Sequence, residues 1–476
     1  KAYGDFNFLS NFFAQVMSFL DMGTSTCFYT RLSQRQKEPG LVSFYFRFSA
    51  AVAVLMLVAV FAMHISGLFV HVWPAQVPMF IYFAAIWAFL SWFMQILNQM
   101  TDAYGLTVPA EVARLMQRIL GAGVIVGLYL ACSLRLTTYF FYYFVMLLAL
   151  VAVLLRILRP RMPSSSDEWK LSGDKARGYM KEFYAYTQPL FVYSAVSLVV
   201  NLLDRWLLQF YGGSVQQGFF GLSFQIATVC LLFTTAMTPL LMREFSIAAG
   251  NADVDRMRRL FRRWVPLFFS LAAFFACFVA VQPGNVVHLL GGRGYTEAVT
   301  AVSVMAFYPV YQTYGQLSAS VFLAAGRTRL YRNIGIPTLL LGLPVTYLLI
   351  APRTAFGLDA GALGLAIKTV GIAFLSVNVM LFFVARVLGL NFWKFVAQQM
   401  AALGTLSALA GIVTIGAAHV PWLNGRLVTT FVVSGIVYSL VAICVGLVLP
   451  RVFGLNREDI KSFYSALLGR FRRSAN

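Results

Sequence analysis

A single lysine, Lys368, lies within GALGLAIKTVGIAFLSV (361–377), a stretch that is otherwise small and apolar. An ammonium group in hydrocarbon costs at least about 2.5–3.5 kcal/mol, so ionisable residues inside apolar helices point to functional sites. Three readings of Lys368 are open. The first is that its side chain extends to the nearer membrane surface. The second is that it pairs with Asp204, and the third is that it lines a cavity that accepts anions. The neighbouring glycines and alanines favour a closely packed or cavity-lining helix over a lipid-facing one.

Three arginines are further candidates for binding an anionic cargo. Arg114 and Arg118 are one helical turn apart and share a face. A guanidinium matches phosphate oxygens in a bidentate fashion, so such a pair suits phosphate. The alternative for both is that the side chains reach the inner membrane surface. Arg205 lies within a span beside Asp204, and adjacent residues on a helix point in different directions.

Two acids and one polar aromatic segment complete the candidates. Asp21 and Asp204 are the acids furthest inside spans, so either could carry a coupling H+ or Na+, or could neutralise a nearby arginine. Tyr311 and Gln312, in FYPVYQTYGQ, suit sugar hydroxyls and ring stacking, although a core or interfacial role explains them equally. The scattered cysteines and histidines have no metal-binding spacing. We expect no metal, no catalytic residue and no cofactor beyond the coupling ion.

These residues must be positioned by membrane helices. Of the 476 residues, 60% are hydrophobic and 11% are charged, whereas a soluble domain has about a quarter charged residues. Apolar runs of about 20 residues recur along the chain, which predicts an all-α polytopic membrane protein. Thirteen spans are expected near 6–24, 45–68, 77–98, 110–132, 137–158, 185–209, 217–241, 264–284, 297–324, 334–351, 361–387, 397–420 and 427–449.

The charges of the connections predict the orientation of the chain. Most of the 37 lysines and arginines lie in alternate connections, including 156–181 and 243–263, and in the segment after residue 450. The positive-inside rule places these segments, and the C-terminus, in the cytoplasm. The formal net charge of +20 therefore reflects topology and requires no nucleic-acid partner.

An internal repeat predicts two related lobes. Residues 3–20 resemble 217–233, and AYGLT (103–107) matches AAGRT (324–328). The span at 185–209 has no counterpart before residue 3, so we expect fourteen helices in the intact protein: two pseudo-symmetric six-helix lobes and a C-terminal helix pair. The expected parts are an N-lobe at 1–158, a cytoplasmic linker at 159–184, a C-lobe at 185–387, the helix pair at 388–449 and a basic cytoplasmic tail at 450–476.

The connections on the outer side argue against an enzyme. All of them are short, the longest being about 283–296. A membrane glycosyltransferase or polymerase would need a large outer loop or a cluster of acids, and the sequence has neither. Duplicated helical halves are instead typical of secondary transporters.

Several stretches together resemble the multidrug/oligosaccharidyl-lipid/polysaccharide (MOP) exporter superfamily, and specifically the Wzx-type flippases of its polysaccharide-biosynthesis branch. The stretches are FLDMGTSTCFYTR (19–31), TDAYGLTVPAEVARLMQRIL (101–120), LLDRWLLQFYGGSVQQGFFGLSFQIA (202–227) and FLAAGRTRLYRNIG (322–335).

The resemblance implies two lobes that alternate between inward-open and outward-open states. The implied cargo is an undecaprenyl-pyrophosphate-linked oligosaccharide, moved across a bacterial inner membrane for surface polysaccharide assembly, with the polymerase as a partner. Lys368, Arg118 and Arg205 would then contact the cargo. The alternatives are a multidrug exporter of organic cations, a lipid II flippase, and a scaffold of a polysaccharide assembly complex that does not transport.

Overall fold

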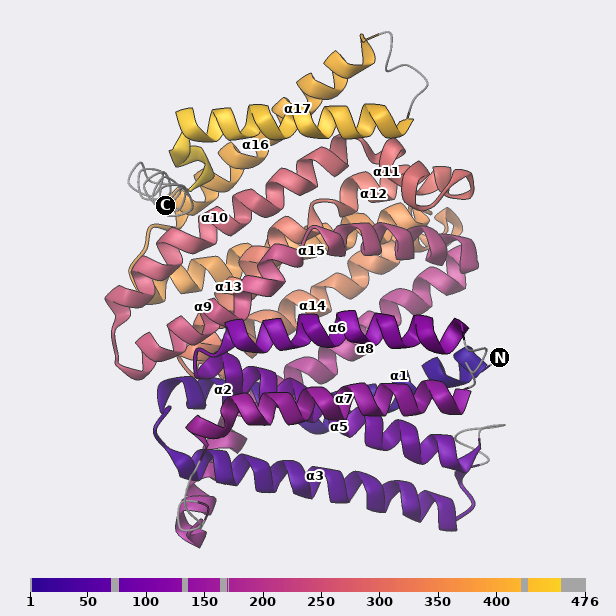
Figure 1. Cartoon of the computed structure of the whole chain (residues 1–476). Helices are drawn as coiled ribbons and strands as arrows, with labels where there is room; N and C mark the ends of the chain where they lie inside the picture. Colours follow the sequence, from indigo (N-terminus) through magenta and orange to yellow (C-terminus); the bar gives the residue numbers. More distant parts are fainter. Residues whose placement is uncertain are drawn as a thin grey trace, which may run out of the picture. The chain divides into compact units, whose positions relative to one another are not determined.

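The structure, a computed structural model, describes residues 2–69, 77–130, 136–162, 169, 171–420 and 427–454. This part of the chain contains 16 α-helices and no β-strand (Figure 1). The expected all-α class is confirmed.

The expected spans are present as helices, although those near 217–241 and 297–324 are each interrupted by a break. Ten helices are long and apolar enough to cross a membrane, and the pair Val215–Val229 and Leu232–Gly250, bent by 54°, makes eleven. The expected span at 6–24 corresponds to α1 (Ala2–Asp21), and that at 297–324 is divided into short helices. This division falls just before Pro309, whose ring excludes a helical hydrogen bond to the preceding turn. The chain is a multi-pass membrane protein.

The chain divides into two compact units, residues 1–191 and 192–476. In the first unit α5 is central, because it contacts each of the other five helices of this unit. Its buried face is rich in alanine, which allows close helix packing. The helices of this unit are α1, α2 (Thr24–Gln34), α3 (Pro39–Ile65), α5 (Pro78–Ala103), α6 (Thr107–Leu130) and α7 (Leu136–Leu158).

The division between the units falls inside α8 (Gly173–Val229). This helix begins within the segment 159–184 that was expected to be a linker. Tertiary contacts explain why this segment is helical. Tyr179 donates a hydrogen bond to Glu38, and Glu182 pairs with Arg35. These contacts fix the first turns of α8 against the ends of α2 and α3.

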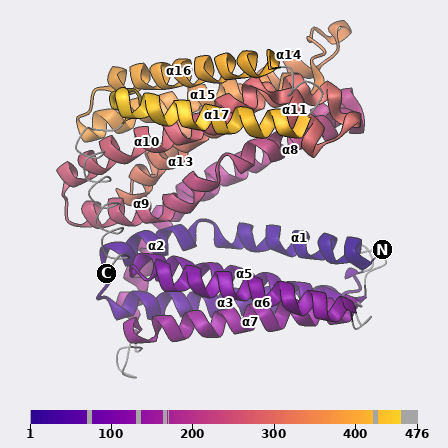
Figure 2. The same cartoon turned by 45° about the horizontal axis from the view of Figure 1, so that its top comes forward.

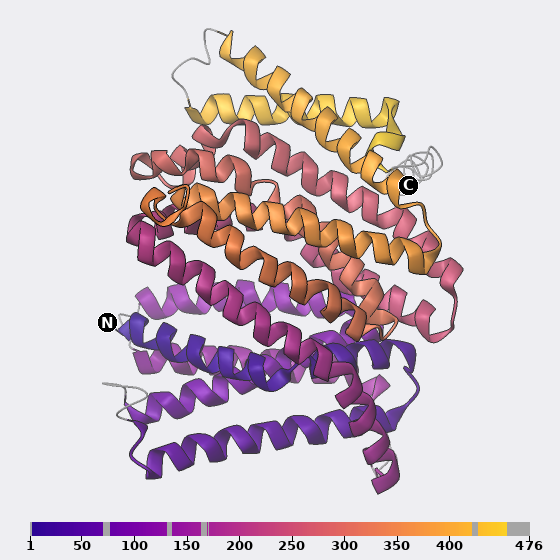
Figure 3. The ribbon, with the colours of Figure 1, turned by 180° about the vertical axis from the view of Figure 1, so that it is seen from behind.

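The second unit is built around α13 and α15, which pack against each other. In this unit α14 lies beside α15, and α16 beside α17 and α10 (Figures 2 and 3). Its other helices are α9 (Leu232–Gly250), α10 (Val254–Val281), α11 (Pro283–Leu290), α12 (Val299–Met305), α13 (Tyr308–Ala324), α14 (Thr328–Ile350), α15 (Gly361–Leu388), α16 (Phe392–Ala418) and α17 (Leu427–Val448).

The two matched pentapeptides form the same turn. Gly105 and Gly326 have φ of 76° and 68°, a left-handed conformation that glycine adopts without strain. In each turn the residue after the glycine donates its N–H to a carbonyl five positions earlier, at 2.7 Å and 2.8 Å, as in a Schellman motif. Each turn is followed by a helix that begins at the threonine of the motif, α6 and α14.

The other matched stretches also share a construction. Residues 3–20 belong to α1, which breaks from α2 at Met22 and Gly23, and residues 217–233 span the break between α8 and α9. A helix break therefore follows the matched stretch in the first unit and falls near the end of the matched stretch in the second. The shared turn is the feature of the sequence repeat that the structure shows in both units.

Candidate functional site

Lys368 and Asp204 form a buried ion pair inside the second unit. Lys368 lies on α15 and Asp204 on α8, and each is 7% exposed. The lysine ammonium binds Oδ2 of the aspartate, while Thr346 of α14 donates to Oδ1 at 2.7 Å. Three helices thus meet at one charge-neutral site. Pairing with Asp204, one of the three readings open from the sequence, is what the structure shows.

Small residues make room for this pair. Lys368 lies seven residues after Gly361, the start of α15, which is about 10 Å along the helix. A Cβ added at Gly342 would lie 2.8 Å from Cε and 3.2 Å from Nζ of Lys368. Gly364 lies equally close to α14, because its added Cβ would be 2.9 Å from the carbonyl oxygen of Leu349. Glycines on both helices therefore allow the lysine to fit between them.

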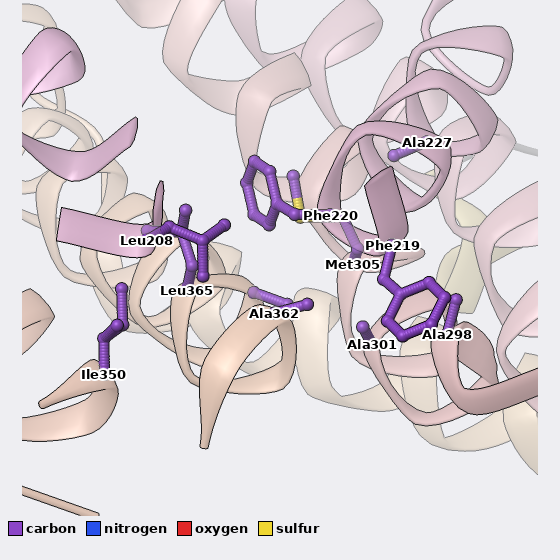
Figure 4. Close-up of a cluster of buried hydrophobic side chains, with 11 residues drawn as sticks. Leu208, Phe219, Phe220, Ala227, Ala298, Ala301, Met305, Ile350, Ala362 and Leu365 are labelled. Atoms are coloured by element: carbon purple, nitrogen blue, oxygen red, sulfur yellow. The ribbon is translucent and has the colours of Figure 1, made fainter. Parts of the chain in front are cut away.

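An apolar cluster lies beside the pair along α8 and α15. Figure 4 shows the adjacent cluster, to which α8 contributes Leu208, Phe219 and Phe220 and α15 contributes Ala362 and Leu365. Leu208 is one turn from Asp204, and Leu365 is three residues before Lys368. In such surroundings an ion is tolerated only with a well-placed partner. The cost of burying Lys368 is offset by Asp204.

The close fit at Gly342 gives a first prediction. Gly342→Ala should destabilise the protein by about 1–3 kcal/mol, because the new methyl group overlaps the lysine side chain. Gly371→Ala is the matched control, since α15 leaves open space there; its effect should be neutral, or stabilising by up to about 1 kcal/mol. Thermal unfolding of both purified variants measures the difference. Equal midpoints would contradict the close fit.

Arg205 lies next to this pair along α8 but has different partners. Its guanidinium stacks over the Phe220 ring at 4.4 Å and donates to Gln217 Oε1 at 3.3 Å. It forms no ion pair with a carboxylate among the described residues. Arg205 is therefore a half-buried cation that is oriented but not neutralised.

Tyr311 and Gln312 lie on α13, and the contacts recorded for them do not include Lys368 or Asp204. Tyr311 is buried and packs edge-on against Phe374 at 5.2 Å. Gln312 is half-buried beside Gly315. The next residue, Thr313, shares a hydrogen bond of 2.9 Å with Thr234 of α9. The structure thus places Tyr311 in the packing of α13 against α15.

Asp21 occupies a separate polar site in the first unit. It ends α1 and its carboxylate faces the start of α2, where Oδ1 accepts from the Ser25 N–H at 3.0 Å. Thr24, the Ser25 hydroxyl and the Trp92 indole donate to the same carboxylate at 2.9–3.1 Å. A carboxylate is favoured at a helix N-terminus, where backbone N–H groups are unpaired. In the described part of the chain Asp21 has no ion-pair partner, so neutral donors alone hold its charge.

The two arginines of α6 differ in their surroundings. Arg114 pairs with Glu111, one turn before it, and its Nε is buried without a hydrogen-bond partner. Arg118 is exposed on the surface of the first unit. They share a helix, as expected, but among the described residues only Arg114 has a carboxylate partner.

A charged network joins α2 to α8 at the end of the first unit. Oε1 of Glu182 pairs with Nε of Arg31 and with Nη2 of Arg35, each at 2.9 Å. Nη1 of Arg35 also donates to Oε2 of Glu182 at 3.3 Å. Burial alone would lower the pKa of Arg35, but the charge of Glu182 outweighs this and raises the pKa. Arg35 therefore stays charged at any physiological pH, and its pair with Glu182 acts as a permanent link. The described residues contain no group of three His, Cys, Asp or Glu that could hold a metal ion.

Comparison with known proteins finds similarity in structure only. No protein-family model matches the chain, and no curated protein matches it. One similar structure is an outward-facing multidrug resistance MATE family transporter of the MOP superfamily, with TM-score 0.65 and 15% identity over 82% of this chain and 87% of that one.

Two other solved structures have a similar TM-score, sequence identity and coverage. A MOP superfamily transporter from Pyrococcus furiosus, described as having a binding pocket of reverse polarity, has TM-score 0.62 and 15% identity over 82% and 88% of the chains. A Vibrio cholerae MATE transporter in its bent form has TM-score 0.61 and 13% identity over 81% and 89%. At such identities the likeness concerns the fold alone. The chain therefore has the two-lobed helical fold of the MATE-type transporters of the MOP superfamily.

Proposed function

We propose that this protein exports a lipid-linked anionic oligosaccharide by alternating access, with an undecaprenyl-pyrophosphate carrier as the cargo lipid. The proposed location is a bacterial inner membrane, with the C-terminus in the cytoplasm. A transport function is supported by the fold, because the similar solved structures are transporters. We propose no catalytic role.

The observation that carries the cargo class is the charge balance of the second unit. Asp204, an acid within a span, is neutralised by Lys368. In the described part of the chain Arg205 has no carboxylate within ion-pair distance, and an amide and an aromatic ring hold it. Among the described residues, Arg205 therefore remains beside the neutral pair as a cation without an ion-pair partner. That balance suits a cargo with a phosphate or pyrophosphate group better than a cationic cargo.

An apolar cavity supports a cargo with a hydrocarbon part. It has a volume of about 590 Å³ and lies between α8, α10, α11 and α17 of the second unit. Its walls include Phe274, Phe275, Phe278 and Phe431, with almost no polar surface. Such a cavity favours an apolar chain, since burying hydrocarbon there leaves no polar group unpaired.

A multidrug exporter of organic cations is the second candidate, and Asp21 is the observation that favours it. This carboxylate has only neutral donors, so an organic cation would supply its missing countercharge. One of the similar solved structures is itself a multidrug resistance transporter.

The test uses the full-length gene in a bacterial strain that lacks its own oligosaccharide flippase. We expect the wild type to restore surface polysaccharide. Arg205→Ala should lose export by about tenfold or more and accumulate the lipid-linked precursor, because the desolvated cation for the pyrophosphate is gone. Arg205→Lys should keep part of the activity. Arg353→Ala, an arginine outside the spans, is the control for charge removal.

Two outcomes would decide against the proposal. Failure of the wild type to restore polysaccharide, together with efflux of cationic dyes that Asp21→Asn abolishes, would establish the second candidate. Full export by Arg205→Ala at matched expression would remove Arg205 from the cargo site.

A further inference from the structure

A basic pocket lies at the end of the second unit where α10 and α16 begin and α15 ends. Its volume is about 370 Å³, within the range of about 300–1,000 Å³ that is usual for ligand sites. Among the described residues three cations line it, Arg258 and Arg262 from α10 and Lys394 from α16, and no acidic residue does. The pocket therefore has a positive potential.

One of the three cations is fixed and forms the rigid wall of the pocket. Arg258 donates through Nε to the carbonyl of Leu388 at 2.7 Å and through Nη1 to Asp255 at 2.8 Å. It lies against Gly389, where an added Cβ would be 2.9 Å from Nη2, and this glycine has φ of 63°. Arg258 thus caps the C-terminus of α15 and is committed to holding the helices together.

The other two cations are available to a ligand. Arg262 and Lys394 are both exposed, and neither side chain has a hydrogen-bond or ion-pair partner among the described residues. They come from different helices and line the same pocket. A phosphate group between them would satisfy both charges at once.

The position of the pocket along the helices matches the membrane surface. From Trp264 to the end of α10 there is no charged residue, so the hydrocarbon region begins directly after Arg263. Trp393 is 73% exposed beside Lys394, and exposed tryptophans gather at the level of the lipid headgroups. The same end of the unit carries the basic connections that place it on the cytoplasmic side.

We propose that this pocket binds the headgroup of an anionic phospholipid of the surrounding bilayer. The phosphate binds Arg262 and Lys394, and the start of the acyl chains packs against the apolar lining residues Pro266, Leu390 and Phe395. Basic pockets between membrane helices on the cytoplasmic side recognise headgroups in this way. The site is independent of the cargo, since none of its residues belongs to the proposed transport path.

A lipid fits these observations better than a free phosphate compound. The pocket combines two exposed cations with apolar walls, and only an amphipathic ligand uses both. Free phosphate would leave the apolar part unfilled, and the bilayer supplies lipid at far higher local concentration than the cytoplasm supplies any one anion.

The test measures lipid binding to the full-length protein purified in a mild detergent. Phosphatidylglycerol, phosphatidylcholine and inorganic phosphate are added in separate arms, and both the thermal midpoint and the bound lipid by native mass spectrometry are recorded. The double variant Arg262→Gln, Lys394→Gln is compared with Arg259→Gln, Arg329→Gln, which removes two exposed charges outside the pocket. We expect phosphatidylglycerol alone to stabilise the wild type, and the pocket variant to bind it on the order of tenfold more weakly or less.

The control variant separates a site from general attraction to anionic membranes. An equal loss of binding in both double variants would overturn the proposal, because it would mean diffuse electrostatics. Equal stabilisation by phosphatidylcholine would also overturn it. Stabilisation by inorganic phosphate that phosphatidylglycerol does not reproduce would assign the pocket to a soluble anion instead of a lipid.

Discussion

Lys368→Ala is expected to destabilise the protein by about 3–5 kcal/mol, because it leaves the Asp204 carboxylate buried without its partner. Asp204→Ala should have a similar cost, since it strands the ammonium group. The measurement is thermal or chemical unfolding of the purified variants in one detergent. Lys181→Ala, an exposed lysine on α8, is the control and should change stability by no more than about 0.5 kcal/mol.

The double variant Asp204→Leu, Lys368→Met distinguishes an ion pair from two independent contributions. It should recover most of the lost stability, because apolar side chains of similar volume fill the site with no charge left unpaired. Thr346 would still donate to the carbonyl of Gly342, at 2.9 Å. Additive losses in the double variant would show that the two residues do not act as a pair.

A further variant, Lys368→Arg, tests whether the pair also takes part in transport. Lys368→Arg keeps a cation opposite Asp204 but needs more room than Gly342 leaves, so stability should fall less than in Lys368→Ala. If Lys368 also contacts the cargo, as the sequence predicts, variants that keep a positive charge at position 368 should export and variants that lose it should not. Export by a stable Asp204→Leu, Lys368→Met protein at the wild-type rate would limit the pair to a structural role.

The repeat and the helical class were predictable because they rest on local chemistry. An A-x-G-x-T pattern specifies a turn through the glycine at φ near 70°, and the same pattern occurs twice. The cost of burying one ammonium group predicted that Lys368 must be compensated, and Asp204 was one of few acids within spans. Which acid compensates it is a contact between residues 164 positions apart. Periodicity gives the face of each helix but not which helices are neighbours.

The remaining site residues could not be assigned from the sequence for a related reason. Arg262 and Lys394 belong to connections whose basic charge predicts topology. The number of basic residues in those connections is the same whether or not two of them line one pocket. Glu182 lies in a segment whose polarity indicated a linker. Its role depends on Arg31 and Arg35 lying opposite it, at the far end of another helix. Charge patterns identify a side of the membrane, and only tertiary contacts identify a pocket or a link.

Asp21→Ala is expected to be the most damaging single change in the first unit. The carboxylate accepts four hydrogen bonds, from Thr24, from the backbone and side chain of Ser25, and from Trp92 of α5. Hydrogen bonds to a charged group are worth about 1.5–3 kcal/mol each, and buried donors left unpaired add a further cost. We expect a loss of about 2–4 kcal/mol in total, less than the sum of the four bonds, because Asp21 itself is only half-buried and water can enter in place of its carboxylate. Thermal unfolding measures it.

Asp21→Asn separates the structural role of Asp21 from its proposed role in ion coupling. Asparagine keeps an acceptor oxygen for the Ser25 N–H and still caps α2, so the loss of stability should be about 1 kcal/mol, well below that of alanine. If Asp21 carries the coupling proton or sodium ion, this stable variant should nevertheless lose transport driven by an ion gradient while retaining exchange of cargo without one. Gradient-driven transport at the wild-type rate in Asp21→Asn would leave Asp21 as the cap that joins α1 to α2, because a neutral amide can neither release a proton nor balance the charge of a cation.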